Sequence, residues 1–336
     1  MSFSQSKREH IKKYITEQIG TGGKNLASRT MDAFGVSENT IYRYLRELKS
    51  EGIIIKTDRG YSLAHKDSLD LVIKRNDSPD EENIYRKNIR PIMEDLAKNI
   101  EKIWHYGFSE IMNNAIDHSE CKTIRISISK DHLKTAMTIA DDGIGIFEKI
   151  RKHFDLPALE DACTELFKGK LTTDKKHHSG EGIFFTSRMF DRFAILSSGR
   201  MYSYNDIEYI EEIAGISPDK GTLTYFELRN DSKKEIKEIF DRYADIDGGF
   251  TRTSIPLKNI YGDYPVSRSQ AKRLYNRLDS FEEVILDFDG ITDMGQGFAH
   301  ELFSVFAKAH PKVRLITENT CPDIIRMMNH VKGSTP

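Results

Sequence analysis

The sequence predicts an α+β protein of several domains, and three observations support this fold class. Its 336 residues are enough for two to three domains of ordinary size, each with its own core. Hydrophobic residues make up 38% of the chain and charged residues 30%, which is typical of a globular protein. Helical and alternating patterns come in separate blocks. The expected divisions are 1–66, a linker 67–82, 83–232, a connector 233–265, and 266–336.

No segment of the sequence is typical of a membrane or secreted protein. Apolar runs fall short of the roughly 18 residues that span a bilayer, and the start MSFSQSKREH has no apolar stretch behind its charges. Cys121, Cys163 and Cys321 lie far apart and form no CxxC pair, which excludes a disulfide framework and a cysteine zinc cluster. We therefore expect a cytoplasmic protein without a membrane partner.

Positive charge is concentrated at the N-terminus. Residues 1–66 hold 12 Lys and Arg against 7 Asp and Glu, a net charge of +5. The rest of the chain holds 38 against 45, a net charge of −7. A nucleic-acid partner is therefore expected at the N-terminus alone.

The first block contains three helical patterns followed by a hairpin. The first helix is KREHIKKYITEQI, and the second runs from about Asn25 to Ala33 after the break GTGG. The third is SENTIYRYLRELKSEG, with Ile41, Leu45 and Leu48 as its buried stripe. The segment IIIKTDRGYSLA is typical of two short strands about a turn.

This order of elements resembles a winged helix-turn-helix domain. In that family the third helix enters the major groove of DNA and the hairpin contacts phosphate. The resemblance implies the following DNA-facing residues: Asn39, Thr40, Tyr42, Arg43 and Arg46 on the third helix, with Lys56 and Arg59 on the hairpin. The alternative is a protein-binding or dimerisation module whose basic face is merely solvated.

The central block begins with one long helical pattern from Asn83 to about His118, with a kink at Pro91. Its apolar stripe keeps helical spacing through Ile100, Trp104, Phe108, Ile111 and Ala115. A polar set lies on adjoining turns: Glu110, Asn113, Asn114 and Asp117. Asparagine is a poor helix former, so helix propensity does not explain the presence of Asn113 and Asn114. Taken alone, the set could also be a solvated face.

Two alternating strands, TIRISIS and KTAMTIA, lead into a carboxylate and two glycines: Asp141, Gly143 and Gly145. Glycines let a backbone approach a flat ligand, and the carboxylate accepts a hydrogen bond from it. Further along, a basic stretch ends in Gly180-Glu181-Gly182 directly before a helix, where free N–H groups suit phosphate. Three further strands, the last beginning at Gly221-Thr222, complete a sheet.

These pieces, in this order, resemble the GHKL ATPase superfamily of gyrase B subunits, heat-shock chaperones, mismatch-repair ATPases and histidine kinases. The resemblance covers residues 83–230 and implies an α/β sandwich that binds ATP and Mg²⁺. It implies that Glu110 orients and deprotonates the attacking water and that Asn114 holds Mg²⁺. Asp141 would accept from the adenine amino group, flanked by Gly143 and Gly145. Other expected nucleotide-binding positions are Asn113, Asp117, Gly180, Gly182 and Thr222, with an ATP lid from about Asp155 to Ser179.

The chain also departs from the family pattern. The glycine motif is only G-E-G, and His177 and His178 have no family role. The basic residues Lys168, Lys170, Lys175 and Lys176 could reach phosphates or be a solvated charge run. A conventional histidine kinase is rejected, because His105 sits on the Glu110 helix itself without a phosphoacceptor pattern.

The last block alternates three helices with two strands, which predicts a small α/β domain. The segment VILDFDGITDMGQGFAHELF resembles STAS-like domains, whose strand–loop–helix turn accepts phosphate in partner-switching systems. Asp293 and Met294 stand where the acceptor serine would be, so phosphorylation there is doubtful and Asp293 could mimic the phosphorylated form. A structural cap or dimer surface is the alternative.

The leading hypothesis is a regulatory DNA-binding protein whose ATP state controls the arrangement of its domains or of a homodimer. ATP hydrolysis is the expected activity. The alternative is a GHKL-type serine kinase or partner-switching regulator that acts on a protein partner, and a nucleotide-binding scaffold with little hydrolysis is a third.

Overall fold

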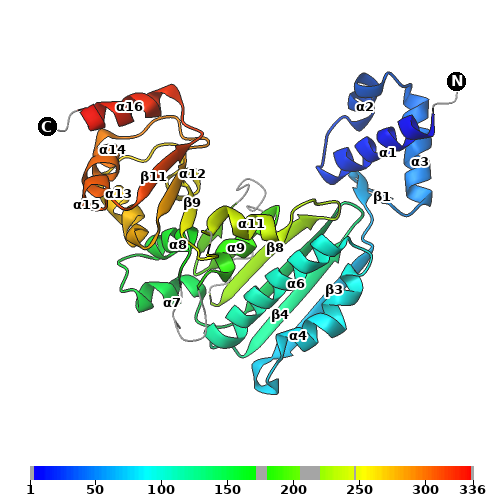
Figure 1. The fold of residues 1–336 in the computed structure, drawn as a ribbon. Helices are drawn as coiled ribbons and strands as arrows, with labels where there is room; N and C mark the ends of the chain where they lie inside the picture. The colour runs from blue at the N-terminus through cyan, green and yellow to red at the C-terminus, as the bar shows by residue number, and fades with distance from the viewer. Residues whose placement is uncertain (1–3, 172–179, 205–219, 246, 334–336) are drawn as a thin grey trace.

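Three units follow one another along the chain in the computed structural model of the protein (Figure 1). The structure describes residues 4–171, 180–204, 220–245 and 247–333. It is an α+β protein of several domains, as the sequence predicts. In the described part of the chain, no helix is long and apolar enough to cross a membrane.

The N-terminal unit contains three helices and a two-stranded antiparallel sheet. Its elements are α1 Gln5–Gly20, α2 Leu26–Phe34, α3 Glu38–Ser50, β1 Ile54–Thr57 and β2 Gly60–Leu63. The predicted stripe of α3 is buried, and Tyr44, which the sequence did not single out, is buried with it. Ile11 and Ile15 of α1 pack into the same core, so amphipathic helices close on each other and on the hairpin.

The central unit is built on a six-stranded sheet in the order β3-β4-β5-β8-β6-β7, with every neighbouring pair antiparallel. Its strands are β3 Asp67–Lys74, β4 Thr123–Lys130, β5 Lys134–Asp141, β6 Arg192–Ser197, β7 Arg200–Ser203 and β8 Thr222–Arg229. Apolar residues alternate along β4 and β5, which puts one face of the sheet against the helices.

The expectation of a linker over residues 67–82 is wrong for its first half, because β3 is the edge strand of this sheet. Its Leu69, Leu71 and Ile73 point toward the core at strand spacing, and Asp70 and Val72 between them face outward. The many polar residues of segment 66–80 made this alternation difficult to recognise in the sequence. A 3₁₀ turn, η1 Arg75–Asp77, follows the strand.

The long helix predicted over residues 83–118 is interrupted, and the interruption is not at Pro91. Pro91 lies in the first turn of α5, where a proline is tolerated. The chain instead leaves the helix at Glu94–Ala97 and begins α6, whose predicted apolar stripe is buried. The elements here are α4 Glu81–Ile84, the π-helical η2 Tyr85–Ile89, α5 Arg90–Met93, α6 Lys98–Asn113 and the π-helical η3 Asn114–His118.

Further helices surround one end of the sheet and one of its faces (Figure 1). They are α7 Ile146–His153, α8 Leu159–Lys168, α9 Gly182–Met189 and α11 Ile236–Tyr243. The residues of α6, α9 and α11 contribute to one core with the inner face of the sheet, including Trp104, Phe185 and Phe226.

The C-terminal unit is a three-stranded parallel sheet with helices. Its elements are β9 Arg252–Pro256, α12 Leu257–Tyr261, α13 Arg268–Tyr275, η4 Leu278–Ser280, β10 Glu283–Asp287, α14 Gln296–His300, η5 Glu301–Phe306, α15 Ala307–Ala309, β11 Arg314–Glu318 and α16 Pro322–Gly333. The alternation of helices and strands that the sequence predicts over residues 266–336 is present. Residues 233–265, expected as a connector, contain α11 and also β9, which pairs with β10. The buried core is continuous between this unit and the central one.

Candidate functional site

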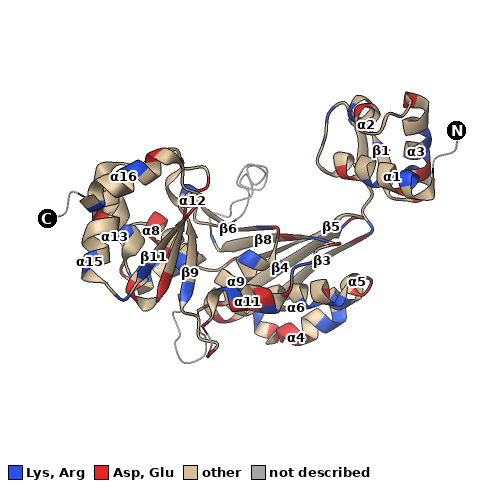
Figure 2. Ribbon diagram, turned by 45° about the horizontal axis from the view of Figure 1, so that its top comes forward, with Lys and Arg blue, Asp and Glu red and all other residues tan. Residues whose placement is uncertain are grey.

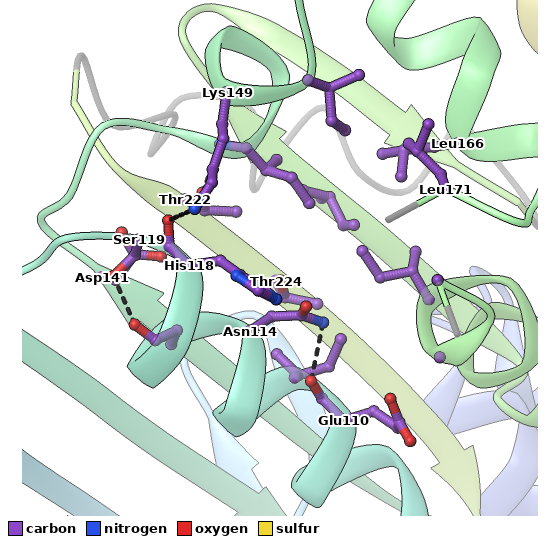
Figure 3. A pocket seen from close by; sticks show the side chains of 18 of the residues that line it. Glu110, Asn114, His118, Ser119, Asp141, Lys149, Leu166, Leu171, Thr222 and Thr224 are labelled. Carbon is purple, nitrogen blue, oxygen red and sulfur yellow. Dashed lines mark hydrogen bonds between the residues drawn. The ribbon is translucent and has the colours of Figure 1, made fainter. Parts of the chain in front are cut away.

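A cavity of about 260 Å³ opens beside the C-terminal part of α6, above the inner face of β5 and β8. Figure 3 shows Glu110 at one end, Asp141 at the other, Asn114 between them, and Leu166 and Leu171 on the opposite wall. The residues that line it are Glu110, Ile111, Asn114, Ala115, His118, Ser119, Ile139, Asp141, Gly145, Ile146, Lys149, Ile150, Leu166, Gly169, Leu171, Gly180, Gly182, Ile183, Phe184, Ile195, Thr222 and Thr224.

Asp141 is the carboxylate at one end of the cavity, where β5 ends. Its Oδ1 accepts a hydrogen bond from the N–H of Gly143 (2.9 Å). Burial raises the pKa of Asp141 to about 6, against hydrogen bonds from Gly143 and Thr222 that favour the ionised form. The next residue, Asp142, faces the other way and accepts from the N–H of Lys122 (2.6 Å). Asp141 is therefore a half-buried carboxylate that a hydrogen-bond donor in the cavity would stabilise.

Thr222 stands beside Asp141 at the start of β8, because the two residues are paired in register. Its Oγ1 accepts from the N–H of Ile146 (3.0 Å), which ties the start of α7 to the sheet. Gly143, in the turn between, has no room for a side chain: a Cβ there would lie 2.0 Å from the carbonyl oxygen of Ser119. The turn is thus packed directly on the backbone that follows α6.

Aliphatic side chains form much of the space between the two ends. They come from α6, β5, α7, α8 and α9, and include Ile111, Ile139, Ile146, Ile150 and Ile183. A cavity with apolar walls and one carboxylate suits a flat aromatic ring that carries a hydrogen-bond donor. The residues present at this end therefore fit an adenine base.

Glu110 lies at the other end, and Asn114 lies one turn further along the helix, toward Asp141 (Figure 3). The Asn114 side chain donates from Nδ2 to the carbonyl oxygen of Glu110 (2.8 Å), so Oδ1 is the acceptor that remains for a cation. The backbone widens here into the π-helical turn η3, a feature often found at functional sites. Both residues come from the polar set predicted on this helix.

Glycines form the wall opposite Glu110. Leu171 donates its N–H to the carbonyl oxygen of Gly180 (2.9 Å), so these two lining residues are joined directly. Gly182 begins α9 directly against α6, and a Cβ on it would come within 1.8 Å of Glu110 Oε2. Backbone N–H groups at the start of a helix suit phosphate, so this cradle fits a polyphosphate chain.

The cavity brings together most of the nucleotide-site residues that the sequence predicts: Glu110, Asn114, Asp141, Gly145, Gly180, Gly182 and Thr222. Asn113, Asp117 and Gly143 are outside its lining. Asn113 is half-buried and Asp117 is exposed on the same helix, while Gly143 supports the Asp141 turn from behind.

Four polar lining residues were missed from the sequence: His118, Ser119, Lys149 and Thr224. Helix spacing could have identified two of them, since His118 is four residues after Asn114 and Lys149 is four residues after Gly145. Thr224 shares a strand face with Thr222. Lys149 donates from Nζ to the carbonyl oxygen of His118 (2.6 Å), and burial lowers its pKa.

The predicted basic residues near the lid have other partners where they are described. Lys168 is buried and pairs with Glu165 (2.6 Å), and Lys170 donates from Nζ to the carbonyl oxygen of Ser280 (2.8 Å). Both expectations, phosphate contact and a solvated run, are wrong for Lys168. Lys175, Lys176, His177 and His178 lie outside the described residues.

A magnesium ion would have to depend on ligands from the nucleotide itself. Within the ranges that the structure describes, no group of three or more His, Cys, Asp or Glu side chains is placed to hold a metal. Asn114 Oδ1 is a suitable hard oxygen ligand, and Mg²⁺ is commonly held by one or two protein oxygens plus substrate phosphates.

The DNA-facing candidates of the N-terminal unit are mostly at the surface. Asn39, Tyr42, Arg43, Arg46, Lys56 and Arg59 are exposed and Thr40 is half-buried. Figure 2 shows that both signs of charge occur on this unit. Arg43 lies 3.9 Å from Glu47 on the same helix, so part of its charge is compensated.

Comparison with known families agrees with this geometry. Residues 100–231 match the family of histidine kinase-, DNA gyrase B- and HSP90-like ATPases. Residues 270–324 match a STAS-like domain family of unknown function. No curated protein matches the chain. The protein therefore combines a GHKL ATPase domain with a C-terminal STAS-like domain.

Proposed function

We propose that this protein binds and hydrolyses Mg-ATP in the cavity, and that the nucleotide state controls how its N-terminal unit engages DNA. One observation carries the nucleotide proposal. A single cavity has a half-buried carboxylate, Asp141, at one end, Glu110 at the other with Asn114 one turn from it, and glycine backbone along the wall beside Glu110.

The adenine end works by hydrogen bonding and shape. The Asp141 carboxylate accepts from an exocyclic amino group, while the Gly143 N–H holds that carboxylate in position. The aliphatic walls exclude water from the ring faces, which strengthens this hydrogen bond. A guanine ring offers a carbonyl oxygen where adenine has its amino group, so the Asp141 carboxylate favours adenine.

The phosphate end supplies the chemistry. Glu110 is the general base: its carboxylate orients a water molecule and takes its proton. Asn114 would hold Mg²⁺ through its side-chain oxygen, and the ion would offset the negative charge on the phosphate oxygens. Gly182 is the first residue of α9 and lines the cavity beside Glu110, so the free N–H groups at the start of this helix are available to phosphate at this end.

Calorimetry and phosphate release test this part of the proposal. We expect ATP with Mg²⁺ to bind the wild-type protein, Asp141→Asn to bind it at least about tenfold more weakly, and Glu110→Ala to bind it but to hydrolyse it only at a low residual rate. If folded wild-type protein gives no heat with any adenosine phosphate plus Mg²⁺, the proposed function is wrong.

The DNA part of the proposal is supported by charge and by connectivity. The N-terminal unit carries a net charge of +5 over residues 1–66, and its α3 face is exposed. The strand β8 begins at Thr222 in the cavity and ends at Arg229, which lies 3.3 Å from Glu17 on α1. Lys13 of α1 lies 3.6 Å from Asp231 just beyond the strand. A gel shift with and without ATP tests whether nucleotide changes DNA affinity.

A protein-serine kinase or partner-switching regulator is the second candidate. It is favoured by the STAS-like match, because that resemblance implies that Asp293, exposed in the loop after β10, replaces the acceptor serine and mimics its phosphorylated form. Incubation with γ-labelled ATP and a cell extract separates the candidates. Label on a protein favours the kinase, and label only in free phosphate favours the ATPase.

A further inference from the structure

The wall of the cavity opposite α6 is contacted by the STAS-like domain. We call residues 169–171 and 180–182 the neck, because the hydrogen bond from Leu171 N–H to the Gly180 carbonyl oxygen (2.9 Å) joins the two stretches. Gly169, Leu171, Gly180 and Gly182 all line the cavity. The position of the neck therefore affects the width of the cavity where phosphate is expected.

Arg277 connects the STAS-like domain to the neck. It lies between α13 and η4, and its Nη2 donates to the carbonyl oxygen of Lys170 (2.8 Å). Its Nη1 lies 2.9 Å from Glu165 Oε2 on α8. The guanidinium carbon is also 4.7 Å from the centre of the Phe154 ring, at the end of α7. One side chain thus contacts the neck and the ends of both helices that lead to it.

The surroundings hold this arginine in one conformation. Its φ is +65°, in the left-handed region that residues other than glycine rarely adopt. Lys168 Nζ donates to the carbonyl oxygens of Arg273 (3.0 Å) and Asn276 (2.8 Å), at the end of α13. Lys168 and Glu165 are 1% and 2% exposed. A buried ion pair that has all its partners favours one arrangement, because removal of a partner leaves a charge uncompensated.

We propose that Arg277 is a positioning residue of the nucleotide site, supplied by the STAS-like domain. It holds the neck through the Lys170 carbonyl and the Glu165 carboxylate, so that the backbone at Gly180 and Gly182 faces the phosphates. The STAS-like domain is in this sense part of the nucleotide site. The inference rests on the nucleotide binding proposed above.

Another arginine of the STAS-like domain, Arg273 on α13, provides a matched control. Arg273 Nε lies 3.1 Å from Asp161 Oδ1, so it also pairs with a buried carboxylate of α8 across the same interface. In the described residues its side chain is not hydrogen-bonded to the neck. Arg273→Gln therefore removes an interface ion pair of the same kind and leaves the hydrogen bond to Lys170 in place.

Hydrogen exchange in the nucleotide-free protein tests the neck directly. In Arg277→Gln, we expect the Leu171 amide to exchange about tenfold faster than in the wild type, because the neck opens more often. Arg273→Gln should leave this rate unchanged. Equal rates in Arg277→Gln and the wild type would overturn the proposal, whether or not the protein binds ATP.

Calorimetry with ATP and AMP tests the consequence for the site. Arg277→Gln should weaken Mg-ATP binding about tenfold and AMP binding much less, since the neck lies at the phosphate end. Arg277→Lys keeps a charged donor, so its affinity for Mg-ATP should lie between those of the wild type and Arg277→Gln. It also replaces Arg277→Gln in the comparison if that variant does not fold. A purely structural role would weaken both nucleotides equally, or would be matched by Arg273→Gln.

The outcomes separate this proposal from the proposed function. If the wild type binds no nucleotide, the proposed function fails and the positioning role fails with it. If the wild type binds ATP and Arg277→Gln binds it equally well, only the role of Arg277 is wrong.

Discussion

Gly182 lies against the carboxylate of Glu110, so closely that a Cβ on Gly182 would come within 1.8 Å of Glu110 Oε2. This contact joins the first residue of α9 to α6 across the end of the cavity. A residue without a side chain leaves the carboxylate where it is. The orientation of the proposed general base therefore depends on a glycine more than seventy positions away in the sequence.

Gly182→Ala should separate catalysis from folding. Alanine is accepted in the first turn of a helix, so the free energy of unfolding should change by less than about 1 kcal/mol. The added methyl group pushes the Glu110 carboxylate aside, and a displacement of this size lowers a rate about 100-fold. Steady-state phosphate release should show a lower kcat, while calorimetry gives a similar ATP affinity.

The double variant gives the control for this prediction. In a Glu110→Ala background there is no carboxylate to displace, so Gly182→Ala should cause no further loss of rate. An equal further loss in that background would mean that Gly182 acts through another contact.

Asp141→Asn should stabilise the nucleotide-free protein at neutral and higher pH. Burial raises the pKa of Asp141 to about 6, above the value of 3.8 for an exposed carboxyl. The protonated form is thus favoured in the folded state, and this contribution is complete below pH 4 and lost as the pH rises through 6. Asparagine stays neutral, so the variant should gain up to about 3 kcal/mol at pH 7.5 and nearly nothing at pH 4. Urea unfolding at the two pH values measures the difference.

The same variant should bind ATP at least about tenfold more weakly, because an amide replaces a charged acceptor. Stability and binding then move in opposite directions, which a general folding defect cannot produce. Weaker binding together with a lower free energy of unfolding at pH 7.5 would contradict the assignment of Asp141.

Local patterns predicted much of the fold and of the cavity. Helix spacing identified the apolar stripe of α6 and, on its other turns, Glu110 and Asn114. The change from strand alternation to Asp141 and two glycines marked the end of β5. These signals are local, so a single sequence contains them.

What could not be predicted depends on contacts between distant segments. The basic stretch around Lys168 predicted a solvated or phosphate-binding side chain. Its hydrogen-bond partners Arg273 and Asn276, however, are more than one hundred positions away in the sequence. The edge strand β3 was missed because the exposed Val72 interrupts the polar and apolar alternation, and only the pairing of the strand with β4 defines it. Tertiary packing decides such cases.

Asn114→Ala should remove the dependence of nucleotide binding on Mg²⁺. Asn114 Oδ1 is the proposed protein ligand, since Nδ2 is committed to the Glu110 carbonyl oxygen. Without it, ATP affinity in the presence of Mg²⁺ should fall about tenfold or more, while adenosine, which has no phosphates, should bind as before. Calorimetry with ATP and adenosine, each with Mg²⁺ or EDTA, gives all four values. A parallel loss of adenosine binding would place the defect in the helix rather than at a metal ligand.

Arg46→Ala tests whether the N-terminal unit binds DNA or only another protein. Arg46 is exposed on α3 and donates from Nε to the Tyr42 carbonyl oxygen (3.4 Å), so its loss should leave the buried face of the helix intact. If Arg46 contacts a phosphate, the variant should bind DNA several-fold more weakly, and the slope of log affinity against log salt should fall by about one. Arg326→Ala on α16 removes the same charge from another exposed surface and should change neither value. Each phosphate contact is lost with the cation that makes it. If Arg46→Ala and Lys56→Ala both bind DNA as strongly as the wild type, the basic face does not contact DNA and is assigned to a protein partner instead.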